Sequence, residues 1–518
     1  MQLNNVTLGI AEWRDLIRRV EIGEVREPLV NIDDSDAAPW DAIFVGGGAA
    51  GRFGAAYLKA MGGRPLVVDR WPFLGGSCPH QACVPHHLFS EAARELDYMR
   101  WNSGTLWFPK FDDSTASILD LISLFRSGRA AAHAFMNWQT KEQLGVEYVL
   151  NAEATVIDCH TVNVADGSYT ARNLVLATGA QTAHPRIPGI RKRGVFDFAS
   201  LIEDLDYEPT KCVIVGGSKV AMEYGSFFQA TGCQTTILSR SPLMRGTSLH
   251  HVDEDLRIFV VSGMRARGLT VHEDSATLEI LGDEHVEGVR ARLADGAEIV
   301  LDTDFVLLAT GELPATAELV RTLGIELDEH GFVEVDTQMR TSVAGVYAVG
   351  DLIGSPLEMF KARKCGMTAA RNIMGEPYTL DLSQYPDFLH TTYEVTWVGL
   401  TEQEAREKYG EIIVIQMPPN GLDQPIPLPL AEGSMLYAFT RPEITGYQKA
   451  VFDARSRRLV GAHHVGFGAK DAFQYLDHLI KRGITIDELG EMNELFLNPE
   501  HFIQLSRLRA GQHALHDL

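Results

Sequence analysis

Two stretches of the chain are unbroken apolar runs that end in glycine. The first is Ala42-Ile43-Phe44-Val45, followed by Gly46, and the second is Cys212-Val213-Ile214-Val215, followed by Gly216. Strands of a parallel sheet are covered on both faces, so they lack the alternation of apolar and polar residues that a one-sided strand shows. Each run therefore predicts a buried parallel strand that enters a helix through a glycine turn, the context of a dinucleotide-binding unit. Because the two glycines are 170 residues apart, the sequence predicts two such units.

The two ends of the chain have a different pattern. Residues 1–39 are expected to form an amphipathic helix and a polar connector whose last part is rich in turn-forming residues. From about residue 385 onward the pattern is one of mixed strands and helices without a further glycine turn of this kind, so the C-terminal part is predicted to be a separate α+β domain. At roughly 150 residues per domain, the 518 residues allow about three domains.

Composition narrows the class of protein and of partner. The chain has 46 Lys and Arg against 69 Asp and Glu, a net charge of −23, which argues against nucleic acid or an anionic membrane surface as a partner. No run of about 18 apolar residues is present, and the first residues do not resemble a secretory signal. We therefore expect a cytoplasmic protein. Six cysteines in 518 residues are not a disulfide framework.

The first glycine turn fits the pattern G-x-G-x-x-G at Gly46, Gly48 and Gly51. In this pattern the first glycine makes the tight turn, the second lets the backbone approach a pyrophosphate, and the third lets the helix pack closely on the strand. The next expected strand, Pro65-Leu66-Val67-Val68, ends in Asp69, which is placed to bind a ribose. The segment therefore predicts a nucleotide site rather than a purely structural turn.

The second turn differs at the acidic position. Counting 23 residues on from Gly216 leads to Ser239, followed by Arg240, and Ser218 and Ala221 replace two of the glycines. Loss of the carboxylate removes repulsion toward a 2′-phosphate, and an adjacent arginine can pair with one. This favours NADPH over NADH, with Arg240 as an ordinary surface charge being the alternative.

A close pair of cysteines, Cys78 and Cys83, follows the second strand of the first unit. At the start of a helix the positive end of the dipole favours a thiolate, and the spacing lets the two sulfurs meet across one distorted turn. A zinc site with His80, His86 and His87 is the competing interpretation, but C-x4-C is not a usual zinc spacing. The pair is therefore interpreted as redox-active, with no metal, and the remaining four cysteines as core residues.

These motifs resemble those of the flavin-dependent pyridine nucleotide–disulfide oxidoreductases. Further matches are Ala177-Thr178-Gly179, Ala309-Thr310-Gly311 and Val346-Tyr347-Ala348-Val349-Gly350-Asp351. The resemblance implies an α/β fold with two Rossmann-like FAD- and NAD(P)-binding domains and a C-terminal α+β dimerisation domain, assembled as a homodimer. The implied domains are an extension at 1–39, a split FAD domain at 40–195 and 314–384, an NADPH domain at 196–313 and an interface domain at 385–518. The residues expected to bind FAD are Gly46, Gly48, Gly51, Asp69, Gly179 and Asp351, and those expected to bind NADPH are Gly216, Ser218, Glu223, Ser239, Arg240 and Gly311.

The family's acid–base group does not appear at its expected place. Ordinary members carry a His-Pro-Thr segment and a Glu five residues after the His, contributed across the dimer. Here the segment reads Phe496-Leu497-Asn498-Pro499, and anchoring on the proline puts Asn498 and Ile503 at the two positions. Sliding by two residues puts Phe496 and His501 there instead. A disulfide reductase without its proton donor is expected to be impaired.

One carboxylating member of the family shares this departure, and segments such as GGGAAGRFG and DRWPFLGGSCPH are similar to its own. The resemblance implies reductive cleavage of the thioether 2-ketopropyl-coenzyme M and capture of the product by CO2, with Cys78 attacking the thioether sulfur and Cys83 re-forming a Cys78–Cys83 disulfide. Phe496 and His501 would then replace the usual His and Glu. The residues implied at the substrate are Arg52 and Arg363 for the sulfonate, Met136 in the pocket, and His80 and Gln504 near CO2 or acetoacetate. An NADPH-dependent disulfide reductase with an altered acid–base group is the alternative, and a flavin-binding protein without turnover is a third.

Overall fold

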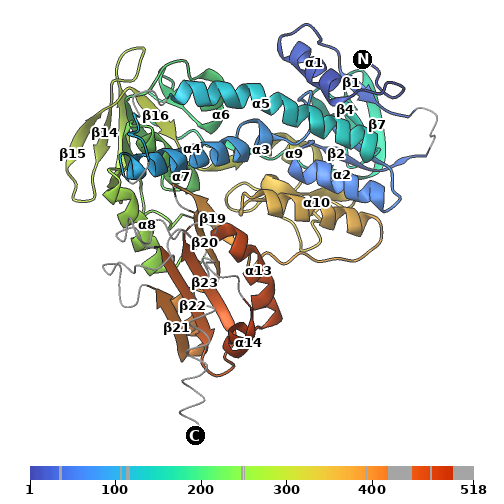
Figure 1. Cartoon of the computed structure of the whole chain (residues 1–518). Coiled ribbons are helices and arrows are strands. Elements are labelled where there is room, and N and C mark those ends of the chain that lie inside the picture. Colours follow the sequence, from blue (N-terminus) through green and yellow to red (C-terminus); the bar gives the residue numbers. More distant parts are fainter. Residues whose placement is uncertain are drawn as a thin grey trace.

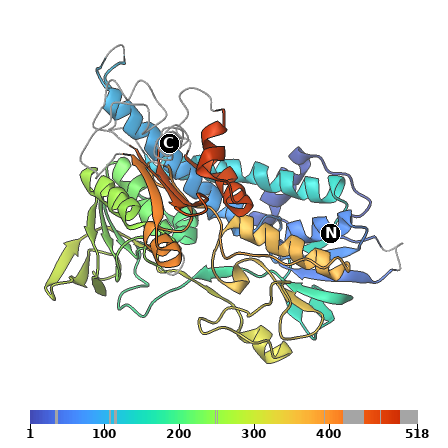
Figure 2. The same cartoon turned by 90° about the horizontal axis from the view of Figure 1, so that it is seen from below.

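The structure is a computed structural model, and it describes residues 1–33, 38–105, 108–112, 117–246, 249, 251–392, 394–417, 446–466 and 469–493. These residues form three units, each built around a sheet (Figures 1 and 2). Phe496, His501 and Gln504 lie outside the described residues. No described helix is long and apolar enough to cross a membrane.

The first unit is built on an eight-stranded sheet of order β1-β4-β3-β2-β7-β6-β5, with β18 paired to β7. Its strands are β1 (Leu29–Asn31), β2 (Trp40–Val45), β3 (Pro65–Val68), β4 (Glu147–Leu150), β5 (Ala154–Val156), β6 (Thr161–Val164), β7 (Gly167–Leu176) and β18 (Val346–Ala348). The central pairs β2–β3, β2–β7 and β7–β18 are parallel, as the apolar run before Gly46 predicts. The chain leaves this sheet after β7 and returns to it at β18.

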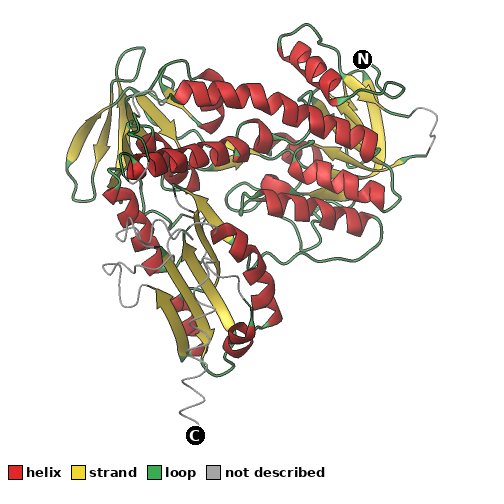
Figure 3. Ribbon diagram, in the orientation of Figure 1, coloured by secondary structure: helices red, strands yellow, loops and turns green. Residues whose placement is uncertain are grey.

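Helices cover this sheet and connect the first unit to the second. They are α1 (Ile10–Glu21), α2 (Ala49–Ala60), α3 (Ser77–His80), α4 (Cys83–Asn102), α5 (Ile118–Trp138), the π-helical turn η2 (Gln139–Gln143), the 3-10 turn η3 (Gly350–Ile353) and α10 (Met359–Ile373). The expected N-terminal helix is α1, which lies against α5, whereas the short strand β1 was not predicted. The long helices α4 and α5 reach across to the second unit (Figure 3). There Phe89 and Phe125 share a hydrophobic core with Phe227.

The second unit contains a five-stranded parallel sheet of order β12-β11-β10-β16-β9. Its strands are β9 (Val195–Phe196), β10 (Lys211–Val215), β11 (Gln234–Leu238), β12 (Thr270–His272) and β16 (Phe305–Leu308), beside an antiparallel sheet of β13 (Ala276–Leu281), β14 (Gly288–Arg292) and β15 (Glu298–Asp302). Its helices are α6 (Phe198–Asp204), α7 (Lys219–Ala230) and α8 (Glu254–Ala266). A ribbon of β8 (Ala180–Thr182) and β17 (Glu312–Pro314) links the two units, and α9 (Ala317–Leu323) follows it.

The third unit is an antiparallel sheet of order β19-β20-β23-β22-β21. Its strands are β19 (Asp387–His390), β20 (Glu394–Gly399), β21 (Ile412–Met417), β22 (Tyr447–Asp453) and β23 (Leu459–Val465), with helices α11 (Glu402–Tyr409), α13 (Ala469–Arg482) and α14 (Ile486–Glu491). The three units meet at the buried ammonium of Lys219, which is paired with Glu358 and Asp387. The predicted combination of two parallel α/β units and a C-terminal α+β unit is therefore confirmed.

Candidate active site

The two cysteines lie at a break between two helices. Cys78 is in α3 and Cys83 is the first residue of α4, with Ala82 (φ −119°, ψ −101°) turning the chain between them. Both are free thiols, so the predicted Cys78–Cys83 disulfide stays a prediction about the oxidised enzyme. A side-chain hydrogen bond from Cys83 lowers the pKa of Cys78, as does the positive charge of Arg363. The same contact and burial raise the pKa of Cys83, so a thiolate is favoured at Cys78 over Cys83, and the role of Cys78 as nucleophile stays a prediction.

Two arginines lie close to each other, and one of them, Arg363, lies near Cys78. Arg52 is on α2 and Arg363 on α10, and their guanidinium carbons lie 5.8 and 4.4 Å from the centroid of the Phe53 ring. Burial and the charge of Arg363 lower the pKa of Arg52 to about 10, which leaves it charged at neutral pH. Within the described part of the chain, neither guanidinium forms an ion pair with a carboxylate, and the buried Arg363 Nε has no hydrogen-bond partner. Two uncompensated cations in one place are suited to bind an anion.

The close approach of α2 and α10 depends on small residues. A Cβ at Gly366 would clash with the carbonyl oxygen of Ala50, and a Cβ at Gly54 would lie 2.9 Å from the carbonyl oxygen of Gly366. The absence of side chains at these two positions lets the helix axes approach. The crossing brings Arg52 and Arg363 together although 310 residues separate them.

Two methionines border the reactive thiol. The Sδ atom of Met359, at the start of α10, lies 3.5 Å from the Cys78 Sγ atom. Met136 packs against the loop before Cys78, since a Cβ at Gly75 would lie 2.6 Å from its Sδ atom. Met359 therefore contacts the thiol itself and Met136 contacts the loop that leads to it, and thioether side chains are apolar and adaptable in shape.

Aromatic rings and imidazoles pack together around His80, which lies in the segment between the two cysteines. The His133 ring stacks on Phe73 with centroids 3.8 Å apart, and His80 lies 5.2 Å from His133 and 5.0 Å from Trp71. Burial lowers the pKa of His80 to about 4 and that of His133 to about 3. Both imidazoles are therefore neutral near pH 7, so neither is a ready proton donor.

The two glycine turns are structural counterparts. A Cβ at Gly46 would clash with the carbonyl oxygen of Ala177, and one at Gly216 with that of Ala309. The next residue faces the end of the following strand in each unit: Gly47 N donates to Asp69 Oδ2 at 2.5 Å, and Gly217 lies against the Ser239 hydroxyl. Ser239 therefore occupies the place of Asp69.

Comparison with known proteins identifies the family. The family model for pyridine nucleotide-disulphide oxidoreductase matches residues 40–372, and the model for its dimerisation domain matches residues 385–504. The chain belongs to the pyridine nucleotide-disulphide oxidoreductases. This confirms the predicted family, and the matched dimerisation domain supports the predicted homodimer.

Similar proteins within this family share about a quarter of their residues with the chain. Mercuric reductase of Bacillus cereus is 24% identical over 494 residues, which cover 94% of this chain and 74% of the relative. Dihydrolipoyl dehydrogenase of Geobacillus stearothermophilus is 24% identical over 87% of this chain and 92% of the relative. A Cu(II) complex of the HOCl-induced flavoprotein disulfide reductase RclA from Escherichia coli has a TM-score of 0.74 at 22% identity, covering 89% of this chain and 98% of that chain. At that identity the structure shows the fold alone.

Members of the family use FAD and NAD(P)H, and the first glycine turn of this oxidoreductase fits FAD. Gly48 is the N-cap of α2 and no side chain caps that helix, so its N–H groups are suited to bind a pyrophosphate. Asp351 Oδ1 is buried without a hydrogen-bond partner, as expected of a carboxylate that accepts from a ribityl hydroxyl. Burial raises the pKa of Asp351, and the buried Lys361 nearby lowers it. Gly179 and Gly311 have positive φ angles of 72° and 91°, and a Cβ at either would meet no other residue. These features fit the predicted cofactor contacts of Gly48, Asp351, Gly179 and Gly311, which stay predictions.

A basic residue, Arg240, follows the strand that comes after the second glycine turn. The Ser239 hydroxyl donates to the Ser241 carbonyl oxygen at 2.6 Å, so it is held within its own loop. Arg240 is exposed and forms no ion pair within the described residues, which leaves its guanidinium available. Ser218 is the N-cap of α7, the helix that follows Gly216.

Glu223 is engaged by protein groups rather than pointing to solvent. Its Oε2 atom lies 3.2 Å from His86 Nδ1, and its Oε1 atom accepts from the backbone N–H of His390 at 2.8 Å. The His87 ring packs against that of His390 at a centroid distance of 3.8 Å. The glutamate therefore connects the helix that begins at Cys83 with the second and third units, and its predicted contact with NADPH stays a prediction.

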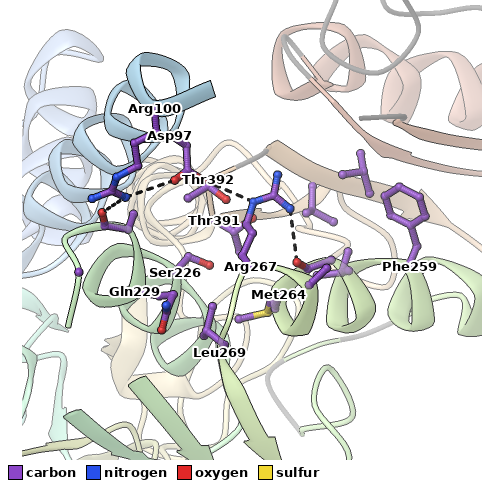
Figure 4. A pocket seen from close by; sticks show the side chains of 17 residues that line it. Asp97, Arg100, Ser226, Gln229, Phe259, Met264, Arg267, Leu269, Thr391 and Thr392 are labelled. Carbon is purple, nitrogen blue, oxygen red and sulfur yellow. Dashed lines mark hydrogen bonds and ion pairs between the residues drawn. The ribbon is translucent and has the colours of Figure 1, made fainter. Parts of the chain in front are cut away.

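A cavity of about 460 Å³ lies elsewhere, between α4, α7, α8 and the third sheet. Asp97 lies between Arg100 and Arg267 at its polar side, while Met264 and Leu269 contribute to its apolar side (Figure 4). None of the predicted site residues lines this cavity. It is therefore separate from the redox site.

The sequence interpretation missed several residues of the site. Gln139 and Thr140 hold Arg52, His133 stacks behind the cysteine loop, and Met359 contacts Cys78. Met359 stands in a segment similar to that of the carboxylating member, so the resemblance could have indicated it. The other three carry no motif of their own.

Proposed function

We propose that the chain catalyses the reaction of 2-oxopropyl-coenzyme M reductase/carboxylase. This is the NADPH-dependent cleavage of 2-(2-oxopropylthio)ethanesulfonate, with carboxylation of the organic product to acetoacetate and release of coenzyme M. The observation that carries the proposal is the pair Arg52 and Arg363, unpaired with acids in the described residues, beside a thiol that favours the thiolate. A short thioether with a sulfonate at one end could place its anion on the arginines and its sulfur at Cys78. The apolar side chains of Met359, at Cys78, and Met136, at the loop before it, suit the remainder of such a substrate.

The cysteines would perform the bond exchange. FAD, when bound, carries two electrons from NADPH to the cysteine pair. The Cys78 thiolate attacks the thioether sulfur, the carbon–sulfur bond breaks, and its electron pair leaves with the carbon as the enolate of acetone. The enolate then forms a carbon–carbon bond with CO2, giving acetoacetate. Attack of the Cys83 thiolate on Cys78 releases coenzyme M and forms the Cys78–Cys83 disulfide.

Exclusion of protons would decide between two products. An acid close to the enolate would convert it to acetone before CO2 could react. The low pKa values of His80 and His133, about 4 and about 3, keep these nearby imidazoles from acting as acids near neutral pH. Phe496 in place of the family's histidine would remove the usual donor. His501 would then orient water or the product carboxylate, with Gln504 and His80 near CO2, and the partner chain would supply the 496–504 segment.

The second nucleotide would be NADPH. Ser239 occupies the place that Asp69 has in the first unit, so no carboxylate repels a 2′-phosphate there. The available guanidinium of Arg240 can pair with that phosphate.

A disulfide reductase of the ordinary kind is the second candidate. The relatives named mercuric reductase and dihydrolipoyl dehydrogenase favour it, because they match almost the whole chain. The two functions differ in the substrate that the thiolate attacks and in whether an acid protonates the product.

A product assay separates the two functions. Purified enzyme with FAD, NADPH, 2-ketopropyl-coenzyme M and bicarbonate is expected to form acetoacetate, and to form acetone slowly when CO2 is withheld. Brisk reduction of glutathione disulfide or lipoamide with no cleavage of the thioether would refute the carboxylase. In the Phe496→His variant acetone is expected to rise at the expense of acetoacetate. An unchanged product ratio would refute the role given to proton exclusion.

A further inference from the structure

We propose that Gln139 and Thr140 are positioning residues that hold Arg52 through neutral acceptors and thereby make the site selective for an anionic substrate. The inference deepens the proposed function and rests on it for the identity of the substrate. Neither residue belongs to a motif of the family pattern. Both are in the π-helical turn Gln139–Gln143 at the end of α5.

The π-helical turn brings two acceptors to one guanidinium. Arg52 Nε donates to Thr140 Oγ1 at 2.7 Å, and Arg52 Nη2 donates to Gln139 Oε1 at 2.6 Å. The Thr140 hydroxyl in turn donates to the Met136 carbonyl oxygen at 2.6 Å, which fixes the direction of its lone pairs. Such local widening of a helix often occurs at functional sites. It places Thr140, which is completely buried, against an arginine 88 residues earlier in the chain.

Neutral acceptors satisfy the guanidinium without cancelling its charge. Arg52 is 6% exposed, so unpaired N–H groups there would be costly. Gln139 and Thr140 meet this need at Nε and Nη2, while Nη1 forms no hydrogen bond with the described residues. The nearby charge is that of Arg363, which is also positive. The remaining donor therefore lies near a second positive charge.

Arg64 in the same unit shows the opposite arrangement. It is 8% exposed, and its Nε and Nη2 atoms donate to the two carboxylate oxygens of Glu147 at 2.7 and 2.9 Å. This pairing uses the same two nitrogen atoms as in Arg52 but neutralises the charge. Arg64 and Arg52 thus differ in the charge of the group that accepts their hydrogen bonds, which is a carboxylate at Arg64 and a neutral amide and hydroxyl at Arg52. Replacing Gln139 by Glu would give Arg52 the neutralised arrangement of Arg64.

The test compares two inert thioethers that differ in charge. The reduced, FAD-loaded enzyme is alkylated at Cys78 with iodoacetamide, and protection is measured with 2-(methylthio)ethanesulfonate and with 2-(methylthio)ethanol. Wild-type enzyme is expected to be half-protected at a lower concentration of the sulfonate than of the alcohol. Gln139→Glu is expected to need at least about tenfold more sulfonate, equivalent to 1.4 kcal/mol, with the alcohol unchanged. Gln143→Glu adds the same charge to an exposed position of the same turn and is expected to behave as wild type.

The outcomes separate this inference from the proposed function. Equal weakening of both thioethers in Gln139→Glu would indicate general damage and overturn the inference, as would no change in either. A wild-type enzyme that does not distinguish the two thioethers would also overturn it. Selective loss of sulfonate protection in an enzyme that makes no acetoacetate would support the inference and refute the carboxylase. Thr140→Val removes the hydroxyl that accepts from Arg52 and is expected to raise KM for the anionic substrate with little change in kcat. Thr140→Ser keeps a hydroxyl and is expected to have the KM of the wild type. A raised KM in Thr140→Ser would count against the role of the hydroxyl.

Discussion

Replacing Arg363 by Met would remove one of the two charges that are proposed to bind the substrate sulfonate. The guanidinium has a buried Nε without a partner, and its carbon lies 4.4 Å from the centroid of the Phe53 ring. Methionine keeps much of the apolar stem that packs there. A hydrogen bond to a charged group contributes about 1.5–3 kcal/mol. At 1.4 kcal/mol for each factor of ten, KM for the anionic thioether is expected to rise about 10- to 150-fold.

Two opposing effects on neighbouring groups refine this expectation. The charge of Arg363 lowers the pKa of Arg52, so its removal raises the pKa of Arg52 and secures the charge that remains. The same charge helps to lower the pKa of Cys78, so its removal raises that pKa and reduces the thiolate fraction at neutral pH. The first effect moderates the rise in KM, and the second lowers kcat. Both constants are therefore expected to change in Arg363→Met.

Alkylation by two reagents isolates the electrostatic part of the effect. In wild-type enzyme Cys78 is expected to react faster with anionic iodoacetate, relative to neutral iodoacetamide, than a free thiol does. Arg363→Met is expected to lose most of that preference, because the reagents differ mainly in charge. Arg371→Met removes a charge from the same helix, where the arginine pairs with Glu376, and serves as the matched control. An unchanged reagent preference together with an unchanged KM in Arg363→Met would refute the anion site.

Three further substitutions test other parts of the structure. Gly51→Ala places a Cβ against a backbone carbonyl oxygen of the first glycine turn and is expected to yield enzyme with little FAD, measured from its visible absorbance. The control Gly128→Ala, where the added Cβ meets no other residue, is expected to retain FAD. Normal FAD content in Gly51→Ala would contradict the assigned packing. Arg240→Ala is expected to raise KM for NADPH with little effect on that for NADH, and equal effects on both would argue against contact with a 2′-phosphate. Cys83→Ala removes the hydrogen bond that lowers the pKa of Cys78, so the pH at which Cys78 becomes reactive toward iodoacetamide is expected to rise; a fall or no change would contradict the assignment of Cys78 as the thiolate.

The backbone of the nucleotide-binding units was predictable because its signal is local. The apolar run Ala42–Val45 lies within β2, and the predicted strand Pro65–Val68 is β3. Strand β1 was missed because it has only three residues and pairs along the edge of the sheet. An edge strand of this length carries too few positions for a periodic pattern.

The site itself was only partly predictable, because its contacts join distant segments. The resemblance supplied Arg52 and Arg363, but their proximity depends on the crossing of α2 and α10, which no local pattern shows. Gln139 and Thr140 have neutral side chains of common types, and only the fold brings them to Arg52. The lack of a carboxylate paired with these arginines among the described residues is likewise a property of three-dimensional packing.

Because the protein has a large negative net charge, the neutral acceptors of Arg52 matter for the binding of an anion. A chain with a net charge of −23 repels small anions at long range, but salt screens that field beyond roughly 10 Å. Inside a partly buried site the screening is weaker, so the local charge decides whether an anion binds. With Arg52 held by an amide and a hydroxyl, its acceptors leave its positive charge uncancelled although acids outnumber bases in the whole chain. The protein would thus exclude polyanions from its surface and still accept a small anionic thioether next to Cys78. Gln139→Glu, which replaces one amide by a carboxylate, is expected to abolish the second property and leave the first unchanged.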